Sequence, residues 1–201
     1  IDTTQSLPES KEYVRSICKQ FGVKLIILRR MDVDFWSVVT KRGFPRRRLR
    51  WCMKEFKSIP LRLFNLYLSN YVGSSNILHI TGTTINESSE RRKVYALRGL
   101  YYYNNHICSF VLHPILDWRR EVVIEYLKKY DIPECPTYKL YGTDGGCYYC
   151  PFIRDVKYYK LLKERHPELF QRIVLAEKSM RNKSAAVYLG VGRKLYLSRL
   201  V

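Results

Sequence analysis

The stretch "NILHITGTTINESSERRKVYALRG" occupies residues 76–99 and decides the fold. It opens on a short apolar run that is typical of a strand, and the Gly, Ser and Thr residues that follow predict a loop. Residues 88–99 then predict a helix or an irregular basic segment. A strand, a loop and a helix in this order form the repeating unit of a parallel α/β sheet.

The same alternation extends outward along the chain. Residues 6–22 carry apolar side chains at helical spacing, and the apolar run "VKLIILRR" (residues 23–30) predicts a strand buried on both faces. "CSFVLHPI" (residues 108–115) predicts another strand, and residues 116–132 predict an amphipathic helix. We therefore expect an α/β fold with a parallel sheet and flanking helices, which binds its ligand at the carboxyl ends of the strands.

No internal repeat or low-complexity linker divides the chain, so we expect one domain over residues 1–201. Its α/β core is expected within residues 1–130, and residues 131–201 are expected to form a cysteine-rich loop followed by C-terminal helices that break near Pro167. The opening "IDTTQSLPES" is typical of the end of a strand, and we expect the protein to start upstream of Ile1.

The chain is strongly basic, with 36 Lys and Arg against 18 Asp and Glu and a formal net charge of +18. This excess favours an anionic partner such as a nucleotide or a nucleic acid, tRNA included, although a basic surface that only maintains solubility has the same composition. No apolar run reaches the roughly 18–20 residues of a membrane span, and no signal peptide is visible. We expect a cytoplasmic protein with no membrane partner.

Two segments carry groups suited to phosphate. "RRRLRWCMKEFK" (residues 46–57) concentrates cations around an expected helix start, and "TGTTINESSERR" (residues 81–92) combines a glycine, several hydroxyls and two arginines. A solvated basic face explains the first segment equally well, and a capped helix start explains the second. The tyrosines at 101–103, 148–149 and 158–159 are candidates to stack nucleic-acid bases, with ordinary packing as the alternative.

The cysteines predict a metal site. Cys147 and Cys150 form a Cys-x-x-Cys pair, Cys135 lies on the same loop, and Cys52 stands among cations that are expected to lower its thiol pKa. Four thiolates suit zinc or an iron–sulfur cluster, and spacing does not separate the two. A dithiol redox pair is the alternative for Cys147 and Cys150. The other cysteines, Cys18 and Cys108, are expected in the core.

Taken in order, these motifs resemble those of the phosphoadenosine phosphosulfate reductase family, within the adenine-nucleotide α-hydrolase superfamily. "DTT" (residues 2–4) is similar to the family's Asp-Thr segment, and "GFPRRRLRWCMKEFKSIPL" (43–61) to its Gly-x-Pro, Arg-Trp-Cys, Lys and Pro pattern. "GTTINESSER" (82–91) is similar to its Gly, Glu-Ser and Arg pattern, and "HPILDWRREVVIEYL" (113–127) to its Pro-Ile-x-x-Trp stretch. "GCYYC" (146–150) matches its Gly-Cys-x-x-Cys loop.

The resemblance implies a Rossmann-like fold and a site for ATP or another adenine nucleotide. The residues that match the family's nucleotide-binding motifs are Asp2, Thr4, Arg50, Lys57, Gly82, Glu87, Ser88 and Arg91. Thr84 stands where many members have an arginine. The family's phosphate-binding Ser-Gly-Gly-Lys-Asp-Ser loop is expected upstream of Ile1.

Members that reduce adenylyl sulfate hold a 4Fe-4S cluster on a Cys-Cys pair and a later Cys-x-x-Cys. Cys52 matches the second cysteine of that pair, Trp51 replaces the first, and Cys135 is the candidate for the missing ligand. The expected ligands are thus Cys52, Cys135, Cys147 and Cys150, with zinc as the alternative to iron and sulfur. No cysteine follows Cys150, where sulfonucleotide reductases have a C-terminal catalytic cysteine.

The expected function is sulfur-related chemistry at the α-phosphate of an adenine nucleotide, as in a sulfonucleotide reductase or an ATP-dependent sulfurtransferase. One alternative is an enzyme that uses ATP to thiolate RNA such as tRNA, which the charge of +18 favours. The other is a non-catalytic nucleic-acid-binding or assembly module with a vestigial nucleotide site.

Overall fold

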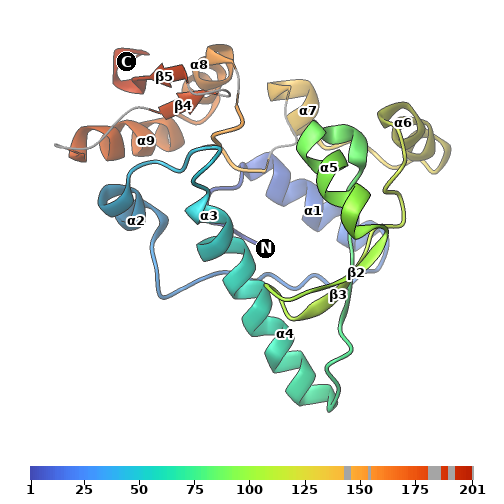
Figure 1. The fold of residues 1–201 in the computed structure, drawn as a ribbon. Coiled ribbons are helices and arrows are strands. Elements are labelled where there is room, and N and C mark those ends of the chain that lie inside the picture. The colour runs from blue at the N-terminus through green and yellow to red at the C-terminus, as the bar shows by residue number, and fades with distance from the viewer. Residues whose placement is uncertain (143–145, 154, 181–186, 190–192, 201) are drawn as a thin grey trace. The chain divides into compact units, whose positions relative to one another are not determined.

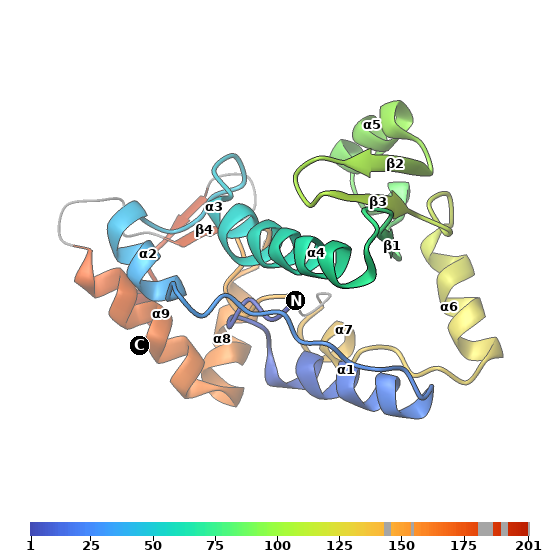
Figure 2. The ribbon, with the colours of Figure 1, turned by 90° about the horizontal axis from the view of Figure 1, so that it is seen from below.

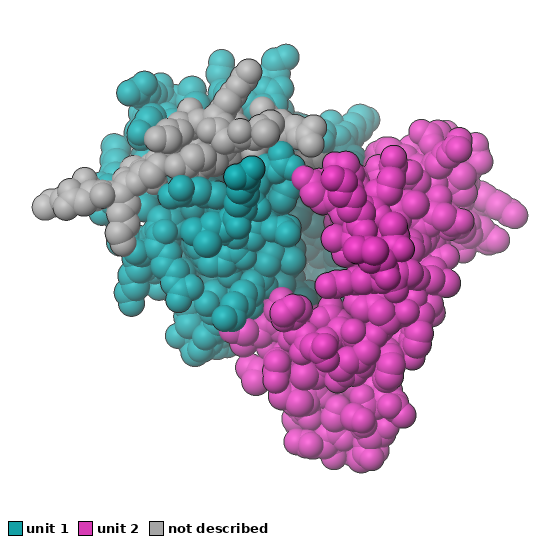
Figure 3. All heavy atoms as spheres, in the orientation of Figure 1, with its two compact units in different colours: residues 1–57, 135–201 teal, residues 58–134 magenta. Residues whose placement is uncertain are grey.

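The computed structural model describes residues 1–142, 146–153, 155–180, 187–189 and 193–200 (Figure 1). The chain divides into two compact units, shown in different colours in Figure 3. Unit 1 comprises residues 1–57 and 135–201, and unit 2 comprises residues 58–134. The expectation of one domain over the whole chain stays a prediction. None of the helices over the described residues has the length and apolarity that a membrane crossing requires.

Unit 2 contains a three-stranded sheet in the order β1-β3-β2. Strand β1 (Leu78–Ile80) pairs in parallel with β3 (Ser109–Leu112), and β2 (Tyr101–Asn104) pairs antiparallel with β3. The predicted α/β fold is confirmed, and β1 and β3 lie in the segments predicted as strands. Strand β2 was not predicted, and it makes this sheet mixed, whereas we expected parallel pairing alone.

Four further elements complete unit 2: α4 (Ile59–Val72), the 3-10 turn η2 (Ile85–Glu87), α5 (Ser89–Arg98) and α6 (Arg120–Lys129). A buried amide ties α4 to the sheet region, because Asn65 donates to the carbonyl of Ile107 at 2.6 Å and lies 2.9 Å from His79 Nε2. Helix α5 lies beside β2 (Figures 1 and 2), where the rings of Tyr95 and Tyr102 are 6.4 Å apart.

Unit 1 is mostly helical. Its elements before unit 2 are α1 (Pro8–Gln20), α2 (Phe35–Arg42), α3 (Trp51–Met53) and the π-helical turn η1 (Lys54–Ser58), whose last residue is the first of unit 2. After the insertion follow α7 (Pro136–Tyr141), α8 (Val156–Arg165), α9 (Pro167–Ser179), β4 (Val187–Leu189), β5 (Arg193–Leu195) and the 3-10 turn η3 (Leu197–Leu200). Strands β4 and β5 pair antiparallel, and α8 and α9 pack side by side with the predicted break at Pro167.

The core of unit 1 is built largely from aromatic side chains. The buried set includes Phe35, Phe44, Trp51, Phe56, Tyr148, Tyr149, Tyr158 and Tyr159. Two of the three tyrosine groups that were candidates for base stacking, 148–149 and 158–159, are therefore packing residues of this core. A buried carboxylate joins the same core to the last turn of the chain, because Glu177 accepts from the backbone N–H of Leu197 at 2.7 Å and from both the N–H and the hydroxyl of Ser198.

The prediction of a buried strand at residues 23–30 is wrong. The segment has no regular secondary structure and pairs with none of the described strands, and Val23, Ile26 and Ile27 are each about half exposed, at 59%, 49% and 53%. Its backbone is held at its two ends, where the Val23 N–H donates to Cys18 and the Leu28 carbonyl accepts from Asp2. The apolar run has strand composition, but no described strand lies beside it to complete the ladder that a buried strand requires.

Candidate functional site

The carboxyl ends of the two parallel strands in unit 2 meet in a polar group. Thr81 follows β1 and donates its N–H to Leu112 at 2.9 Å, so the strand pairing continues to the start of the loop. His113 follows β3, and its Nδ1 lies 2.5 Å from the hydroxyl of Thr81. That hydroxyl is also 3.2 Å from the hydroxyl of Thr83. The arrangement places hydroxyl and imidazole groups at the edge where parallel sheets bind ligands.

His113 was not among the predicted site residues. It is 2% exposed, its Nε2 is buried with no hydrogen-bond partner among the described residues, and the Tyr95 ring meets it edge-on at 4.6 Å. Burial, assisted by the positive charge of Arg91, lowers the pKa of His113 below its ordinary value, so the ring is neutral near pH 7. Its place directly after an apolar strand was the one sequence signal that pointed to it.

The next turn of chain joins three predicted nucleotide-binding residues through local contacts. Thr84 and Glu87 form a capping box over η2, with the Thr84 N–H donating to Glu87 at 3.1 Å. Ser88 caps α5, because its hydroxyl accepts from the Arg91 N–H at 3.1 Å. The Arg91 guanidinium forms an ion pair with the other oxygen of Glu87. The capped helix start that we held as an alternative is therefore present, and it holds Glu87, Ser88 and Arg91 together.

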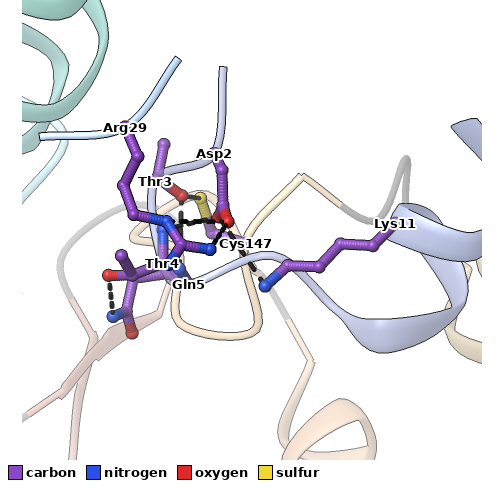
Figure 4. A network of polar contacts seen from close by, with 7 residues as sticks. All are labelled: Asp2, Thr3, Thr4, Gln5, Lys11, Arg29 and Cys147. Carbon is purple, nitrogen blue, oxygen red and sulfur yellow. Dashed lines mark hydrogen bonds and ion pairs between the residues drawn. The ribbon is translucent and has the colours of Figure 1, made fainter. Parts of the chain in front are cut away.

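In unit 1, Asp2 is the centre of a polar network that Figure 4 shows. Its carboxylate accepts from the Thr4 N–H at 2.8 Å and from Arg29, and it lies 3.6 Å from Lys11 Nζ. Burial raises the pKa of this carboxyl, but the bonds from Arg29 and Thr4 and the charge of Lys11 outweigh it, so the pKa lies below its ordinary value. Thr4 adopts a left-handed backbone conformation with φ of 63°.

The same network reaches the cysteine loop. The buried Thr3 hydroxyl lies 3.4 Å from Cys147 Sγ, and Gln5 accepts from the Tyr148 N–H at 2.6 Å. A predicted nucleotide-binding segment and a predicted metal ligand, 144 residues apart in sequence, are thus in contact (Figure 4).

The expectation that surrounding cations lower the pKa of Cys52 is wrong. Burial raises the pKa of this thiol, repulsion from Cys147 raises it further, and the opposing charges of Lys57 and Arg50 do not compensate. The thiol packs against the aromatic core, where desolvation disfavours a thiolate more than the cations favour it. The repulsion also shows that Cys52 and Cys147 are electrostatic neighbours.

The other two predicted ligands have different surroundings. Cys150 packs against the same core as Cys52, whereas Cys135 precedes α7 and has its Sγ 3.1 Å from the hydroxyl of Thr137. Residues 143–145, which lie between Cys135 and Cys147 in the sequence, are outside the described residues. Over the part of the chain that is described, no three His, Cys, Asp or Glu side chains are grouped so as to hold a metal ion. The four-cysteine site stays a prediction.

The predicted nucleotide residues are divided between the units. Asp2, Thr4, Arg50 and Lys57 belong to unit 1, and Gly82, Glu87, Ser88 and Arg91 belong to unit 2. Within unit 1, Arg50 precedes α3 and its guanidinium lies over the Phe152 ring at 5.4 Å. Within unit 2, a Cβ at Gly82 would meet Ile115 at 3.8 Å, which is an ordinary contact.

A family model of the phosphoadenosine phosphosulfate reductase domain matches residues 1–152, which include both polar groups and the Cys-x-x-Cys pair. The chain belongs to this family. The reductase-family domain is also similar to two uncharacterized proteins of Methanocaldococcus jannaschii, MJ0973 and MJ0066. It is 30% identical to MJ0973 over 87% of the chain and 39% of that protein, and 30% identical to MJ0066 over 86% of the chain and 34% of that protein. The domain thus spans well under half the length of both relatives.

Proposed function

We propose that this reductase-family domain binds an adenine nucleotide and supports sulfur-related chemistry at its α-phosphate. The observation that carries the proposal is the grouping of Glu87, Ser88 and Arg91 between the carboxyl end of β1 and the first turn of α5. A helix start that carries a hydroxyl and a guanidinium has the chemistry of a phosphate site. The family match supplies the adenine nucleotide as the class of ligand.

Each of these side chains has a role that its contacts allow. Arg91 is 42% exposed, so a phosphate could replace Glu87 as the partner of its guanidinium. Ser88 uses an oxygen lone pair for the helix cap, which leaves its hydroxyl proton able to bond a phosphate oxygen. Among the described residues a Cβ at Gly82 would make only an ordinary contact with Ile115, and the absence of a side chain there suits close approach of a ligand to the loop backbone. Asp2, Thr4, Arg50 and Lys57 of unit 1 also match the family's motifs, and their part in nucleotide binding stays a prediction.

The reaction that we propose is attack on the α-phosphorus by an acceptor nucleophile, which forms a bond to phosphorus as pyrophosphate leaves from ATP or sulfate leaves from a sulfonucleotide. Charge accumulates on the phosphate oxygens during such an attack, and Arg91 is the described unit 2 cation best placed to stabilise it. His113, at the carboxyl ends of β1 and β3, is neutral near pH 7 and would add no positive charge to the surroundings of Arg91.

We also propose that Cys52, Cys135, Cys147 and Cys150 hold a metal centre, an iron–sulfur cluster in preference to zinc. The four cysteines fit either centre chemically, because thiolates are preferred ligands of both iron–sulfur clusters and zinc. Burial and repulsion from Cys147 raise the pKa of the Cys52 thiol, and a bound cation would offset that repulsion. When bound, a cluster would supply electron transfer, and the chain's part is to hold four thiolates, of which Cys52 and Cys150 lie against the aromatic core.

The nucleotide proposal is tested by calorimetric titration of the full-length protein with ATP, adenylyl sulfate and phosphoadenylyl sulfate. We expect at least one to bind, and Arg91→Ala to weaken that binding by about tenfold or more, the worth of a charge-assisted bond. Arg120→Ala is the matched control, because Arg120 also forms an exposed ion pair within unit 2, with Glu134. Absence of binding to all three nucleotides would contradict the proposal.

The second candidate is ATP-dependent thiolation of RNA, which the net charge of +18 favours over a small acceptor. In that case the protein binds both ATP and RNA, and RNA carries the acceptor atom. A non-catalytic module would bind nucleic acid and no nucleotide, so the same titration separates it from both enzymes.

A further inference from the structure

An exposed aromatic ring lies within cation–π distance of two guanidinium groups beside the cysteine loop of unit 1. The Phe152 ring is 42% exposed, and the guanidinium carbons of Arg47 and Arg50 lie 5.2 and 5.4 Å from its centroid. We propose that this Arg47–Phe152–Arg50 platform binds single-stranded nucleic acid, with one unpaired base stacked on Phe152 and the neighbouring phosphates bound by the arginines of residues 46–50.

The ring is presented by a constrained loop. Pro151 and Ile153, the residues on either side of Phe152, are buried, and the Ile153 N–H donates to the Cys150 carbonyl at 3.1 Å. Because both neighbours are anchored in the core, Phe152 stays at the surface. A base that stacks there would meet a surface that is already ordered, so little conformational entropy is lost on binding.

The arginine segment is fixed to the same loop by buried contacts. The Tyr149 hydroxyl donates to the Pro45 carbonyl at 3.1 Å, and the Tyr149 ring lies 4.8 Å from the ring of Phe44. Two reciprocal backbone bonds of 3.1 Å between Arg46 and Leu49 close the turn that carries Arg47 and Arg48. Ring and cations are therefore held in one unit, and Arg48 at the tip of the turn is exposed.

The chemistry of the platform selects its ligand. An aromatic face accepts any unpaired base, arginine adds cation–π and phosphate contacts, and together they describe a single-strand site. A duplex offers its phosphates but no free base face, so it would use the arginines alone. The strong basic excess of the chain supplies the long-range attraction that such a ligand needs. The buried tyrosines at 148–149 and 158–159 do not compete for this role.

The test is fluorescence anisotropy of a labelled oligouridine RNA with the full-length protein, without nucleotide. We expect Phe152→Ala to weaken binding about tenfold, which corresponds to ~1.4 kcal/mol, and Phe152→Trp to retain it. Tyr71→Ala is the matched control, because Tyr71 is also an exposed aromatic residue, at 78%, and its ring stacks on Tyr67. No described contact places a guanidinium over the Tyr71 ring. We expect Arg48→Ala to reduce the salt dependence by about one phosphate contact.

Several outcomes would overturn the platform. These are unchanged binding by Phe152→Ala, an equal loss in Tyr71→Ala, equal affinity for a duplex of the same length, and no binding of either single-stranded RNA or single-stranded DNA. Stronger binding of single-stranded RNA or of single-stranded DNA would identify which of the two is the natural ligand and would support the proposal. Thermal melting of each variant verifies that it folds. The assay contains no nucleotide, so its result does not depend on the proposed nucleotide site.

Discussion

The polar group in unit 2 and the cysteine loop in unit 1 are held in different ways. In unit 2, Thr84, Glu87, Ser88 and Arg91 contact residues three or four positions away, and the helix start itself sets their geometry. In unit 1, Cys147 contacts Thr3 across 144 residues, and the loop around it is packed on a core of aromatic rings. The first group therefore depends on local backbone structure, and the second depends on the tertiary fold of its unit.

The largest effect is expected at Cys147. If the four cysteines hold a metal, the full-length protein purified without oxygen contains iron, and Cys147→Ala loses it completely because three thiolates do not complete the site. Elemental analysis measures this, and Cys108→Ala is the control, since Cys108 lies in unit 2 and contacts Asn105. Zinc in the wild type would replace iron in the proposal. Wild-type protein without either metal would contradict the site.

The second effect tests how strongly the loop depends on tertiary packing. Phe44 is 2% exposed and contacts the Tyr149 ring, so we expect Phe44→Ala to lower the free energy of unfolding by about 3–5 kcal/mol. Urea denaturation measures it. Phe152→Ala, on the exposed face of the same loop, should lose far less. Equal losses in the two variants would show that the loop is not anchored through Phe44.

The third effect distinguishes the units by pH. The folded-state pKa of His113 is lowered, so the unfolded chain binds more protons, and the stabilisation is present above the ordinary value of 6.5 and is lost as the pH falls below it. His79, also lowered by burial, acts in the same direction. The lowered pKa of Asp2 acts only below the ordinary value of 3.8. Between about pH 7 and 5 we therefore expect loss of stability mainly in unit 2.

Urea denaturation across this pH range is the measurement for that prediction. His113→Gln should reduce the pH dependence of the free energy of unfolding, and adding His79→Gln should reduce it further. Asp2→Asn should leave the slope between about pH 7 and 5 as it is in the wild type. A slope that stays the same without both histidines would show that other groups control it.

The smallest effect belongs to the locally held group. Ser88 caps α5, and Ser88→Ala should lower the free energy of unfolding by about 1 kcal/mol. Ser89, the first residue of the helix, serves as the control, and Ser89→Ala should stay within about 0.5 kcal/mol of the wild type. A loss at Ser88 as large as that at Phe44 would mean that the unit 2 group also depends on distant contacts.

This contrast explains what the sequence could predict. The strand–loop–helix order around Gly82 and the family motifs are local, and the structure places β1, the capped turn and α5 there. The burial of Cys52 and the contact between Thr3 and Cys147 need the folded core, so the cations beside Cys52 in sequence gave the wrong direction for its pKa. The run at 23–30 failed for the same reason, because strand composition does not supply a neighbouring strand.

The carboxylate of Glu177 has a consequence for solvent exchange at the chain's last described turn. A 3-10 turn of only four residues ordinarily frays, and its amides then exchange with deuterium almost at once. Here the Leu197 N–H is buried and bonded to Glu177, and the Ser198 N–H shares the same carboxylate. These two amides should exchange as slowly as those of α9. Their exchange rate would then report how often the packed helices α8 and α9 open together.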